Sequence, residues 1–367
     1  MKLTGFKKFS LILSISLIVC LLGGTTYVSA GFLTGDEALG GVSYFLEKYY
    51  ERVGNDDEGA SGALLADEVT IPDNVAIAKV NDYVNIRSGA GTSYGVVGYL
   101  PKNGMCTVLE LTEDNSWAKI ESGAVTGYVS CEYLYTGEEG RKKAEQLAKL
   151  MATVNAGTVN FRSTPDTVSD DNILATVTNG EALVVIEETV VNKDDETTLW
   201  VKAYLDDMEG YIAKRFVSVA YDWVRAVSMT SIVGADSASN LSSLRAAIVI
   251  EAKKHIGLKY VWGGNSLKTG ADCSGFCLAV YRAVGISTKS MPRTSTELAS
   301  CSKGKKVSLS AAKPGDLVFY GDKSGHVNHV AIYIGNGQII HEAGRASGCK
   351  ISSVNYRTPL KIKNFID

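Results

Sequence analysis

The spacing of hydrophobic and polar residues changes several times along this chain. Residues 35–53 carry apolar residues at helical spacing, and the acidic, small-residue stretch that follows (GNDDEGASGALLADE) predicts a linker. From about Val75 the pattern changes to short alternating segments broken by Gly, Asn and Asp, which predicts strands joined by turns. We therefore expect a helix and a linker, followed by an all-β region.

The all-β region contains an internal repeat. "YVNIRSGAG" at Tyr83–Gly91 matches "TVNFRSTPD" at Thr158–Asp166 at an offset of 75 residues, and the segments that begin at Trp117 and Trp200 match at an offset of 83. The second copy therefore has eight more residues between its matched ends, which we place in the polar segment ETVVNKDDETTL. Two small β-barrels fit this repeat, and EEGRKKAEQLAKLM between them predicts a connecting helix.

Two helices and a hairpin are predicted in the last third of the chain. The segment SLRAAIVIEAKKHIG has a serine start, Lys-Lys-His in its last turn and Gly257 as a C-cap. The segment ADCSGFCLAVYRAVGI predicts a second helix, with Asp272 or a neighbour as its N-cap. "HVAIYIGNGQIIHEA" predicts two antiparallel strands joined through GNG.

The first thirty residues have the features of a secretory signal. Three lysines precede the uncharged apolar stretch FSLILSISLIVCLLGG, and the small residues VSA end at Ala30, where signal peptidase would cut. A retained membrane anchor is the alternative, although the apolar stretch is short for a full span. We expect a secreted protein that works outside the cytoplasm.

Charge is divided unequally along the chain. Residues 31–241 carry 16 Lys and Arg against 33 Asp and Glu, whereas residues 242–367 carry 18 against 7. Such a basic C-terminal domain is attracted to polyanions, and we expect an anionic wall polymer or the acidic half of the same chain. Nucleic acid is disfavoured because the lysines of SKGKK lack interleaved aromatic residues. We expect a monomer.

Six cysteines remain after the predicted signal: Cys106, Cys131, Cys273, Cys277, Cys301 and Cys349. Export permits disulfides but does not require them in a chain that is long enough to build a core. Cys106 and Cys131 are the most plausible pair. Free, buried thiols that pack as small hydrophobic residues are the favoured account of most of the six.

Cys273 has the position expected of a nucleophile. The predicted helix places it in the first turn, where unpaired backbone amides and the helix dipole favour the thiolate. Cys277, one turn later, is expected to point into the core. A lone cysteine at a helix start is usually structural, so the histidines have to decide its role.

Only four histidines are available as a base. His329 and His341 fall on the two strands of the predicted hairpin, so one can take a proton from Cys273 while the other fixes its tautomer. His326 is the rival base, but it lies three residues from His329 and would face the opposite way on a strand. His255 is expected to complement the dipole at the end of its helix.

Six ordered motifs, YVWGG, DCSG, PRTS, PGDLVFY, HVAIYIG and IIHEA, make residues 243–367 similar to the NlpC-type cysteine peptidases of bacterial cell walls. This resemblance implies a reduced papain-like fold with a Cys-His-His catalytic set. It implies that Cys273 is the nucleophile, His329 the base and His341 the orienting residue. The substrate-binding positions that it implies are Tyr260, Asp272, Ser274, Arg293 and Ser295.

The two repeats resemble bacterial SH3-like domains, which share an Asn-(apolar)-Arg-Ser opening and a Trp…Gly-Tyr-(apolar) close. Such domains usually bind cell wall or shape a neighbouring active site. For the individual residues we favour structural roles, with Arg87 and Arg162 bracing turns. The repeated aromatic residues expected in the barrel cores are Trp117, Tyr128, Trp200 and Tyr211.

The resemblance implies a peptidoglycan hydrolase that cuts the γ-D-glutamyl bond to the diamino acid of stem peptides, without a metal or organic cofactor. The alternatives are an N-acetylmuramoyl-L-alanine amidase with a similar Cys-His site and a non-catalytic wall-binding protein. A metal site built from Cys273, Cys277 and two histidines is disfavoured, because both histidines are distant in sequence from the cysteine helix. The substrate is intact wall or trimmed peptide with a free amino end, an amine that Asp272 would suit.

The expected fold class is an α+β papain-like catalytic domain preceded by two small all-β SH3-like barrels. The expected divisions are a signal peptide (1–30), a helix and acidic linker (31–74), barrel 1 (75–136), a linker helix (137–150), barrel 2 (151–221), a linker (222–242) and the peptidase domain (243–367).

Overall fold

The computed structural model describes residues 70–192, 195–229 and 243–367. All of these residues belong to one compact unit, Leu64–Asp367. The predicted signal peptide, the N-terminal helix with its linker and most of the linker before the last domain lie outside the described residues. Within the described ranges, no helix is long and apolar enough to cross a membrane.

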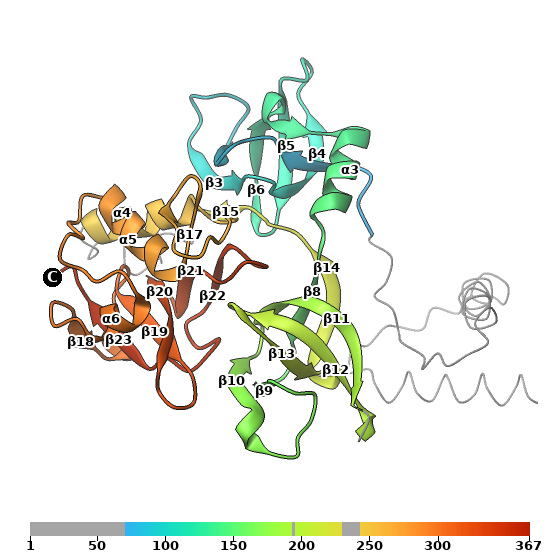
Figure 1. Cartoon of the computed structure of the whole chain (residues 1–367). Coiled ribbons are helices and arrows are strands. Elements are labelled where there is room, and N and C mark those ends of the chain that lie inside the picture. Colours follow the sequence, from blue (N-terminus) through green and yellow to red (C-terminus); the bar gives the residue numbers. More distant parts are fainter. Residues whose placement is uncertain (1–69, 193–194, 230–242) are drawn as a thin grey trace, which may run out of the picture. The chain divides into compact units, whose positions relative to one another are not determined.

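The first repeat forms one antiparallel sheet in the strand order β15-β3-β2-β6-β5-β4-β1-β7 (Figure 1). Its strands are β1 (Val75–Ala78), β2 (Tyr83–Arg87), β3 (Val96–Pro101), β4 (Met105–Leu111), β5 (Trp117–Ser122), β6 (Val125–Ser130), β7 (Leu134–Tyr135) and β15 (Val227–Ser228). Alternate residues of these strands, such as Ile86, Leu100 and Ile120, fill a core of their own. The predicted alternation therefore marks the buried face.

The second repeat forms a seven-stranded sheet in the order β10-β9-β13-β12-β11-β8-β14. The helix α3 (Gly137–Leu147) precedes it, where a connecting helix was predicted. Its strands are β8 (Lys149–Val154), β9 (Thr158–Arg162), β10 (Ile173–Thr178), β11 (Ala182–Asn192), β12 (Asp195–Leu205), β13 (Met208–Ala213) and β14 (Val217–Asp222). The hairpin β11–β12 contains the extra residues of the second copy and is longer than its counterpart β4–β5.

The residues shared by the two repeats have structural roles. Gly127 and Gly210 each lie against the arginine of the repeat, so that a Cβ would come within 2.6 Å of the carbonyl oxygen of Arg87 or Arg162. Only glycine permits this close approach of two strands. The arginine side chains brace turns, as expected: Arg87 donates to the Tyr94 carbonyl (2.7 Å), and Arg162 bonds the 169–172 turn.

The repeated tryptophans differ from one another. Trp200 is buried in the second barrel, as expected of a core residue, whereas Trp117 is only half-buried. Trp117 instead lines a surface hollow of the first barrel together with Tyr83 and Tyr133. The expectation of a core position was therefore wrong for Trp117, because this end of β5 lies against an open hollow. It was also wrong for Tyr128 and Tyr211, which are half-buried as well.

The last domain combines α-helices with a six-stranded sheet in the order β18-β23-β19-β20-β21-β22 (Figure 1). Its helices are α4 (Ser243–Lys253), α5 (Cys273–Ala283) and α6 (Ser295–Ser300). Its strands are β16 (Asn265–Ser266), β17 (Gly270–Ala271), β18 (Lys305–Val307), β19 (Leu317–Gly321), β20 (Val327–Gly335), β21 (Gln338–Glu342), β22 (Cys349–Ser353) and β23 (Lys361–Asn364). The predicted fold class, α+β after two all-β units, is confirmed.

Strand β20 is buried on both faces, which positions the site. Val330 and Ile332 pack in the core that contains α5, while Ala331 and Tyr333 belong to a second core. That second core also holds the interior of the second barrel, so the barrel covers the face of the sheet opposite α5. Because side chains alternate along a strand, His329 lies on the barrel side.

All six described cysteines are free, and four of them are buried. The Cys106–Cys131 pair considered from the sequence is therefore not formed. Cys106 lies in the core of the first barrel, and Cys277 and Cys349 lie in the core of the last domain. They pack as small hydrophobic residues, which was the favoured account.

Candidate active site

Cys273 is the first residue of α5, and the helix begins there because of its N-cap. The Asp272 side chain accepts a hydrogen bond from the Gly275 backbone N–H at 2.7 Å, which satisfies one of the unpaired amides of the first turn. Both the predicted helix and the predicted cap are confirmed. Cys277, one turn on, is fully buried in the core, as expected.

The surroundings of Cys273 keep its thiol neutral. Burial raises the pKa of the thiol to about 12, and the Asp272 carboxylate contributes to the increase, against opposing hydrogen bonds from the backbone N–H groups of Val330 and Ser274. The expectation that the helix start favours a thiolate was therefore wrong for this structure. The helix amides act on the sulfur, but burial outweighs them. Any attack by this sulfur needs a base to take its proton.

His329 on β20 and His341 on β21 form a buried pair. Nε2 of His329 lies 2.7 Å from Nδ1 of His341, so a single proton is shared in a hydrogen bond between the rings. Burial lowers the pKa of His329, and it lowers that of His341 well below the usual value, with the neighbouring ring adding to the effect. Both rings are therefore neutral near pH 7, and the nitrogen of His329 left over from this bond is Nδ1.

Cys273 and His329 line the same cleft, which has a volume of about 280 Å³. The predicted substrate-binding residues line it as well: Tyr260, Asp272, Ser274, Arg293 and Ser295. Among the residues that the structure describes, no hydrogen bond joins the Cys273 sulfur to either histidine. Catalytic hydrogen bonds are often long in a free enzyme and shorten when substrate binds.

Asp206, from the turn between β12 and β13 of the second barrel, reaches the histidine pair. Its carboxylate lies 3.9 Å from His341 Nδ1 and is buried. Arg357 donates to Asp206 Oδ2 at 2.6 Å, and the Tyr356 hydroxyl donates to the same oxygen at 2.9 Å. Burial raises the pKa of Asp206, but His329, Arg357 and His341 outweigh it and bring the pKa down to about 2. The carboxylate is therefore ionised.

A second buried carboxylate lies on the far side of the pair. His341 Nε2 is 3.1 Å from the Ser352 hydroxyl, and that hydroxyl donates to Glu181 Oε1 at 3.2 Å. Glu181 directly precedes β11 of the second barrel and forms an ion pair with Lys350. Burial raises the pKa of Glu181, while the Lys350 ammonium opposes this shift and favours the ionised form.

Asp272, Ser274 and Arg293 bind one another. Arg293 forms two hydrogen bonds of 2.8 Å to the two oxygens of Asp272, and it also donates to Ser274 Oγ at 2.8 Å. Gly263 and Gly275 donate backbone N–H groups to the same carboxylate. The Asp272 charge is thus already paired, so the expectation that Asp272 suits a substrate amine loses its support.

Tyr260 is tied to the second barrel. Burial raises the pKa of its hydroxyl, and a hydrogen bond with Asp207 raises the pKa further. Asp207, next to Asp206 in the barrel turn, also accepts a hydrogen bond from the Arg345 backbone N–H at 3.2 Å. Part of the lining of the cleft therefore comes from the second barrel.

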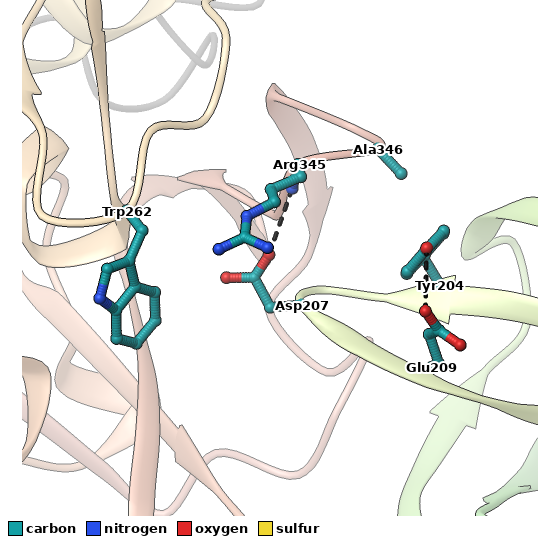
Figure 2. A pocket seen from close by; sticks show the side chains of 6 residues that line it. All are labelled: Tyr204, Asp207, Glu209, Trp262, Arg345 and Ala346. Carbon is teal, nitrogen blue, oxygen red and sulfur yellow. Dashed lines mark hydrogen bonds between the residues drawn. The ribbon is translucent and has the colours of Figure 1, made fainter.

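A second hollow of about 460 Å³ adjoins the cleft and shares Asp207 and Trp262 with it. Figure 2 shows Asp207 between Trp262 and the hydrogen-bonded pair of Tyr204 and Glu209. The Trp262 side chain is largely exposed. A flat aromatic face with charged groups around it gives room for a substrate that extends beyond the cleft.

The other two histidines are not part of the pair. His326 precedes β20, its side chain is 84% exposed, and it lies 3.4 Å from Asp322. His255 bonds Glu251, one turn earlier along the chain. The structure therefore brings His329, not the rival His326, to the cleft of Cys273.

The ligand atoms of Asp206, His329 and His341 lie within 4.8 Å of one another, a spacing that three ligands of one cation would show. Their bonding does not fit a metal ion, because the Arg357 guanidinium already occupies Asp206 and the facing nitrogens of the two rings bond each other. A fixed cation next to the carboxylate disfavours a second one. We assign the cluster to hydrogen bonding between charged and neutral side chains.

Glu342 is a buried acid without a hydrogen-bond partner among the described residues. It follows His341 on β21 but points to the opposite face. Burial raises the pKa of Glu342 to about 9, with Asp272 contributing, so the side chain is protonated at pH 7.

Reasoning from the sequence missed six side chains around the histidine pair: Glu181, Asp206, Asp207, Ser352, Tyr356 and Arg357. They follow no local motif, and three of them belong to the second barrel. Alternation along β22 puts Ser352 on a buried face, but only the docking of the barrel brings a carboxylate to it.

Comparison with known proteins identifies two known domain families in this chain. Residues 257–362 match the model of the NlpC/P60 family, and residues 82–135 match the bacterial SH3 domain. The match to the SH3 model covers the first repeat alone, although the second repeat also forms an all-β sheet.

Among curated proteins, the "Probable endopeptidase p60" of Listeria innocua is 45% identical over 109 residues, which are 30% of this chain and 21% of that protein. The "Putative N-acetylmuramoyl-L-alanine amidase YrvJ" of Bacillus subtilis is 26% identical over 197 residues, 52% of this chain and 32% of that protein. Among solved structures, the NlpC/p60 domain of the peptidoglycan hydrolase SagA is 41% identical, covering 33% of this chain and 97% of that chain, with a TM-score of 0.29. The chain spans about a fifth of the length of the p60 protein.

The last domain brings a cysteine at a helix start and one histidine of a buried pair to the same cleft. The chain belongs to the NlpC/P60 family and carries a bacterial SH3 domain ahead of that domain.

Proposed function

We propose that this chain is a secreted peptidoglycan hydrolase, a cysteine endopeptidase in which Cys273 is the nucleophile, His329 the base and His341 the residue that orients the base. The shared cleft carries this proposal, because it is lined by a buried thiol and by a neutral imidazole whose Nε2 is bonded to a second imidazole. The NlpC/P60 match and the p60 relative support the same class of reaction.

In the proposed reaction, the Cys273 thiol gives its proton to His329 Nδ1 while the sulfur attacks the scissile carbonyl carbon. The Cys273 backbone N–H, at the unpaired start of α5, partly stabilises the oxyanion. The tetrahedral intermediate breaks down to a thioester as the leaving amine takes the proton from His329. Water, deprotonated by His329, then attacks the thioester and releases the carboxylic acid and the thiol.

The substrate positions are proposed on the same basis. Tyr260 and Ser295 face the cleft and are offered as direct contacts to the peptide. We propose that Asp272, Ser274 and Arg293 support the lining of the cleft and do not bind substrate directly. The Asp272 carboxylate and the Arg293 guanidinium already pair with each other. The bond we assign is the γ-D-glutamyl bond to the diamino acid, and no cofactor takes part in the proposed steps.

The proposed partners are stem peptides or muropeptides of peptidoglycan, together with anionic wall polymers attracted by the basic C-terminal domain. The lysine and arginine excess of residues 242–367 supports this. The signal-like first thirty residues support a location outside the cytoplasm, in the wall.

Two measurements test the proposal. Cys273→Ala should lower the hydrolysis of purified wall at least about 1,000-fold, as removal of a nucleophile does, while Cys301→Ala should leave it unchanged. Hydrolysis by Cys273→Ala at the rate of the unchanged chain would refute the cysteine mechanism.

Mass spectrometry of the released fragments shows which bond is cut. An endopeptidase leaves a dipeptide stub on the sugar, whereas an amidase, the activity named for the Bacillus subtilis relative, releases whole stem peptides. Comparing digests of intact wall with digests of free stem peptides also shows whether a free amino end is required.

A further inference from the structure

We propose that the second barrel is a working part of the active site, because its Asp206 and Glu181 are positioning residues that fix the tautomer and the charge of the His329–His341 pair. This inference rests on the proposed function. It assigns a role in preparing the base to two carboxylates from outside the NlpC/P60 domain. An SH3-like barrel by itself is expected to bind cell wall or to shape a neighbouring active site.

The first step concerns the tautomer and starts from Glu181. The Ser352 hydroxyl has one proton, which it donates to Glu181. Its oxygen can therefore only accept from His341 Nε2, so the proton of His341 lies on Nε2. His341 Nδ1 is then an acceptor, and His329 Nε2 must be the donor in the 2.7 Å bond. The free Nδ1 of His329 is left unprotonated.

The second step concerns charge. When His329 takes the thiol proton, a positive charge forms on a buried ring pair, and Asp206 is the ionised carboxylate that lies against it. A fixed charge that is already in place stabilises the developing charge without reorganisation. Arg357 and Tyr356 hold Asp206 in place by hydrogen bonds, although the Arg357 charge offsets part of its effect.

Other charged and titratable groups also face the pair. From the catalytic sheet and the segment that follows it come Tyr320 on β19, Lys350 on β22, Tyr356 and Arg357, and from the barrel come Glu181, Asp206 and Asp207. Asp206 raises the pKa of both rings, whereas Arg357 lowers it for both. Removal of the Asp206 charge therefore moves the pKa of both histidines downward.

The third step concerns the docking of the barrel, which is tight where the carboxylates enter. A Cβ on Gly344 would collide with the Asp206 carbonyl, so this backbone contact needs glycine. Lys149 donates to the Ala346 carbonyl at 2.7 Å, and the interiors of the barrel and the sheet form one core. Asp206 is thus held rigidly, as a positioning residue must be.

The test compares full-length variants at matched concentration of folded protein. Asp206→Asn should lower kcat about 10- to 100-fold with little change in KM, because the group acts on the base and not on the substrate. The acidic limb of the kcat/KM profile, set by protonation of the base, should move to lower pH. Asp222→Asn, an exposed carboxylate of the same barrel, should change neither quantity.

Ser352→Ala is the second variant, and it tests the positioning role if Asp206→Asn does not fold. It removes the acceptor for His341 Nε2 and should lower kcat about tenfold, as should Glu181→Gln. An unchanged kcat and acidic limb in folded Asp206→Asn, or an unchanged kcat in Ser352→Ala, would overturn the inference while leaving the proposed function intact. Full activity of Cys273→Ala would overturn the proposed function itself.

Discussion

The turn between β5 and β6 of the first barrel and the turn between β12 and β13 of the second occupy the same place in the repeat. At the offset of 83 residues, Gly123 and Ala124 correspond to Asp206 and Asp207. The first residue of each turn has the same left-handed backbone, with φ of 57° at Gly123 and 53° at Asp206. Glycine adopts this conformation without strain, whereas aspartate is only tolerated there. The second barrel therefore carries a less favourable residue at the position that meets the histidine pair, in line with the positioning role proposed for Asp206.

The largest loss of activity is expected when the turn of the second barrel is given the two residues of the turn in the first barrel. Asp206→Gly combined with Asp207→Ala relieves the backbone at position 206 but removes the charge beside the histidines and the partner of Tyr260. We expect the barrel to remain folded and kcat/KM to fall about 100-fold or more. Thermal unfolding and hydrolysis rates measure the two effects. If activity fell only as much as the amount of folded protein, the turn of the second barrel would have no role in catalysis, and the comparison would be contradicted.

The buried acid Glu342 gives the next largest effect, now on stability. Its folded pKa of about 9 lies above the ordinary value of 4.5, so the folded state keeps a proton that the unfolded state releases. Stability therefore falls as the pH rises from 4.5 to 9. Glu342→Gln should remove this loss and raise the free energy of unfolding by about 3 kcal/mol at pH 7.

Denaturant unfolding between pH 4 and pH 9 measures this, with the exposed Glu139→Gln as the control. Equal stabilities of Glu342→Gln and the unchanged chain at pH 7 would show that Glu342 is ionised and paired.

The paired glycines of the repeat separate stability from activity. Gly127→Ala and Gly210→Ala each bring a Cβ within 2.6 Å of a strand carbonyl, so each should cost about 1–3 kcal/mol. Only Gly210→Ala displaces β13, the strand next to the turn that carries Asp206, and only it should lower kcat. Unfolding curves and kcat of the two variants side by side measure this. An equal loss of kcat in both variants would count against a special role of the second barrel.

The smallest effect is expected from the reverse exchange, Gly123→Asp. It places an aspartate in the left-handed backbone of the first barrel and should cost about 1 kcal/mol in stability. Activity should not change, because the side chain described against that turn is Arg225 and not a histidine of the site. Kinetic assays and thermal unfolding check this, and a change in kcat would mean that the first barrel also acts on the site.

Much of this architecture could be predicted from local patterns. The alternation around His329, the cap at Asp272 and the hairpin that ends near His341 depend on neighbours in sequence, and each of them appears in the structure. The thiol pKa of Cys273 could not be predicted, because it depends on burial, which a helix pattern does not reveal.

The carboxylates around the histidines were missed for a different reason. Asp206 lies about 120 residues or more along the chain from His329 and from His341. It contacts the histidine pair only because the second barrel packs on the sheet. The sequence held one usable signal, a pair of aspartates where the other copy of the repeat has glycine and alanine. From the sequence alone, two neighbouring aspartates are typical of an exposed turn, because the packing of the barrel on the sheet is not visible there.

The titration of the four histidines by NMR, in full-length Cys273→Ala with and without Asp206→Asn, tests the central claim most directly. With Asp206 in place, the pKa values of His329 and His341 should lie below the ordinary histidine value, because burial outweighs the carboxylate. Removal of the carboxylate should move both pKa values lower still, because Asp206 raises the pKa of both rings. Unaltered titration of His329 and His341 would contradict the claim that the second barrel sets the charge of the base.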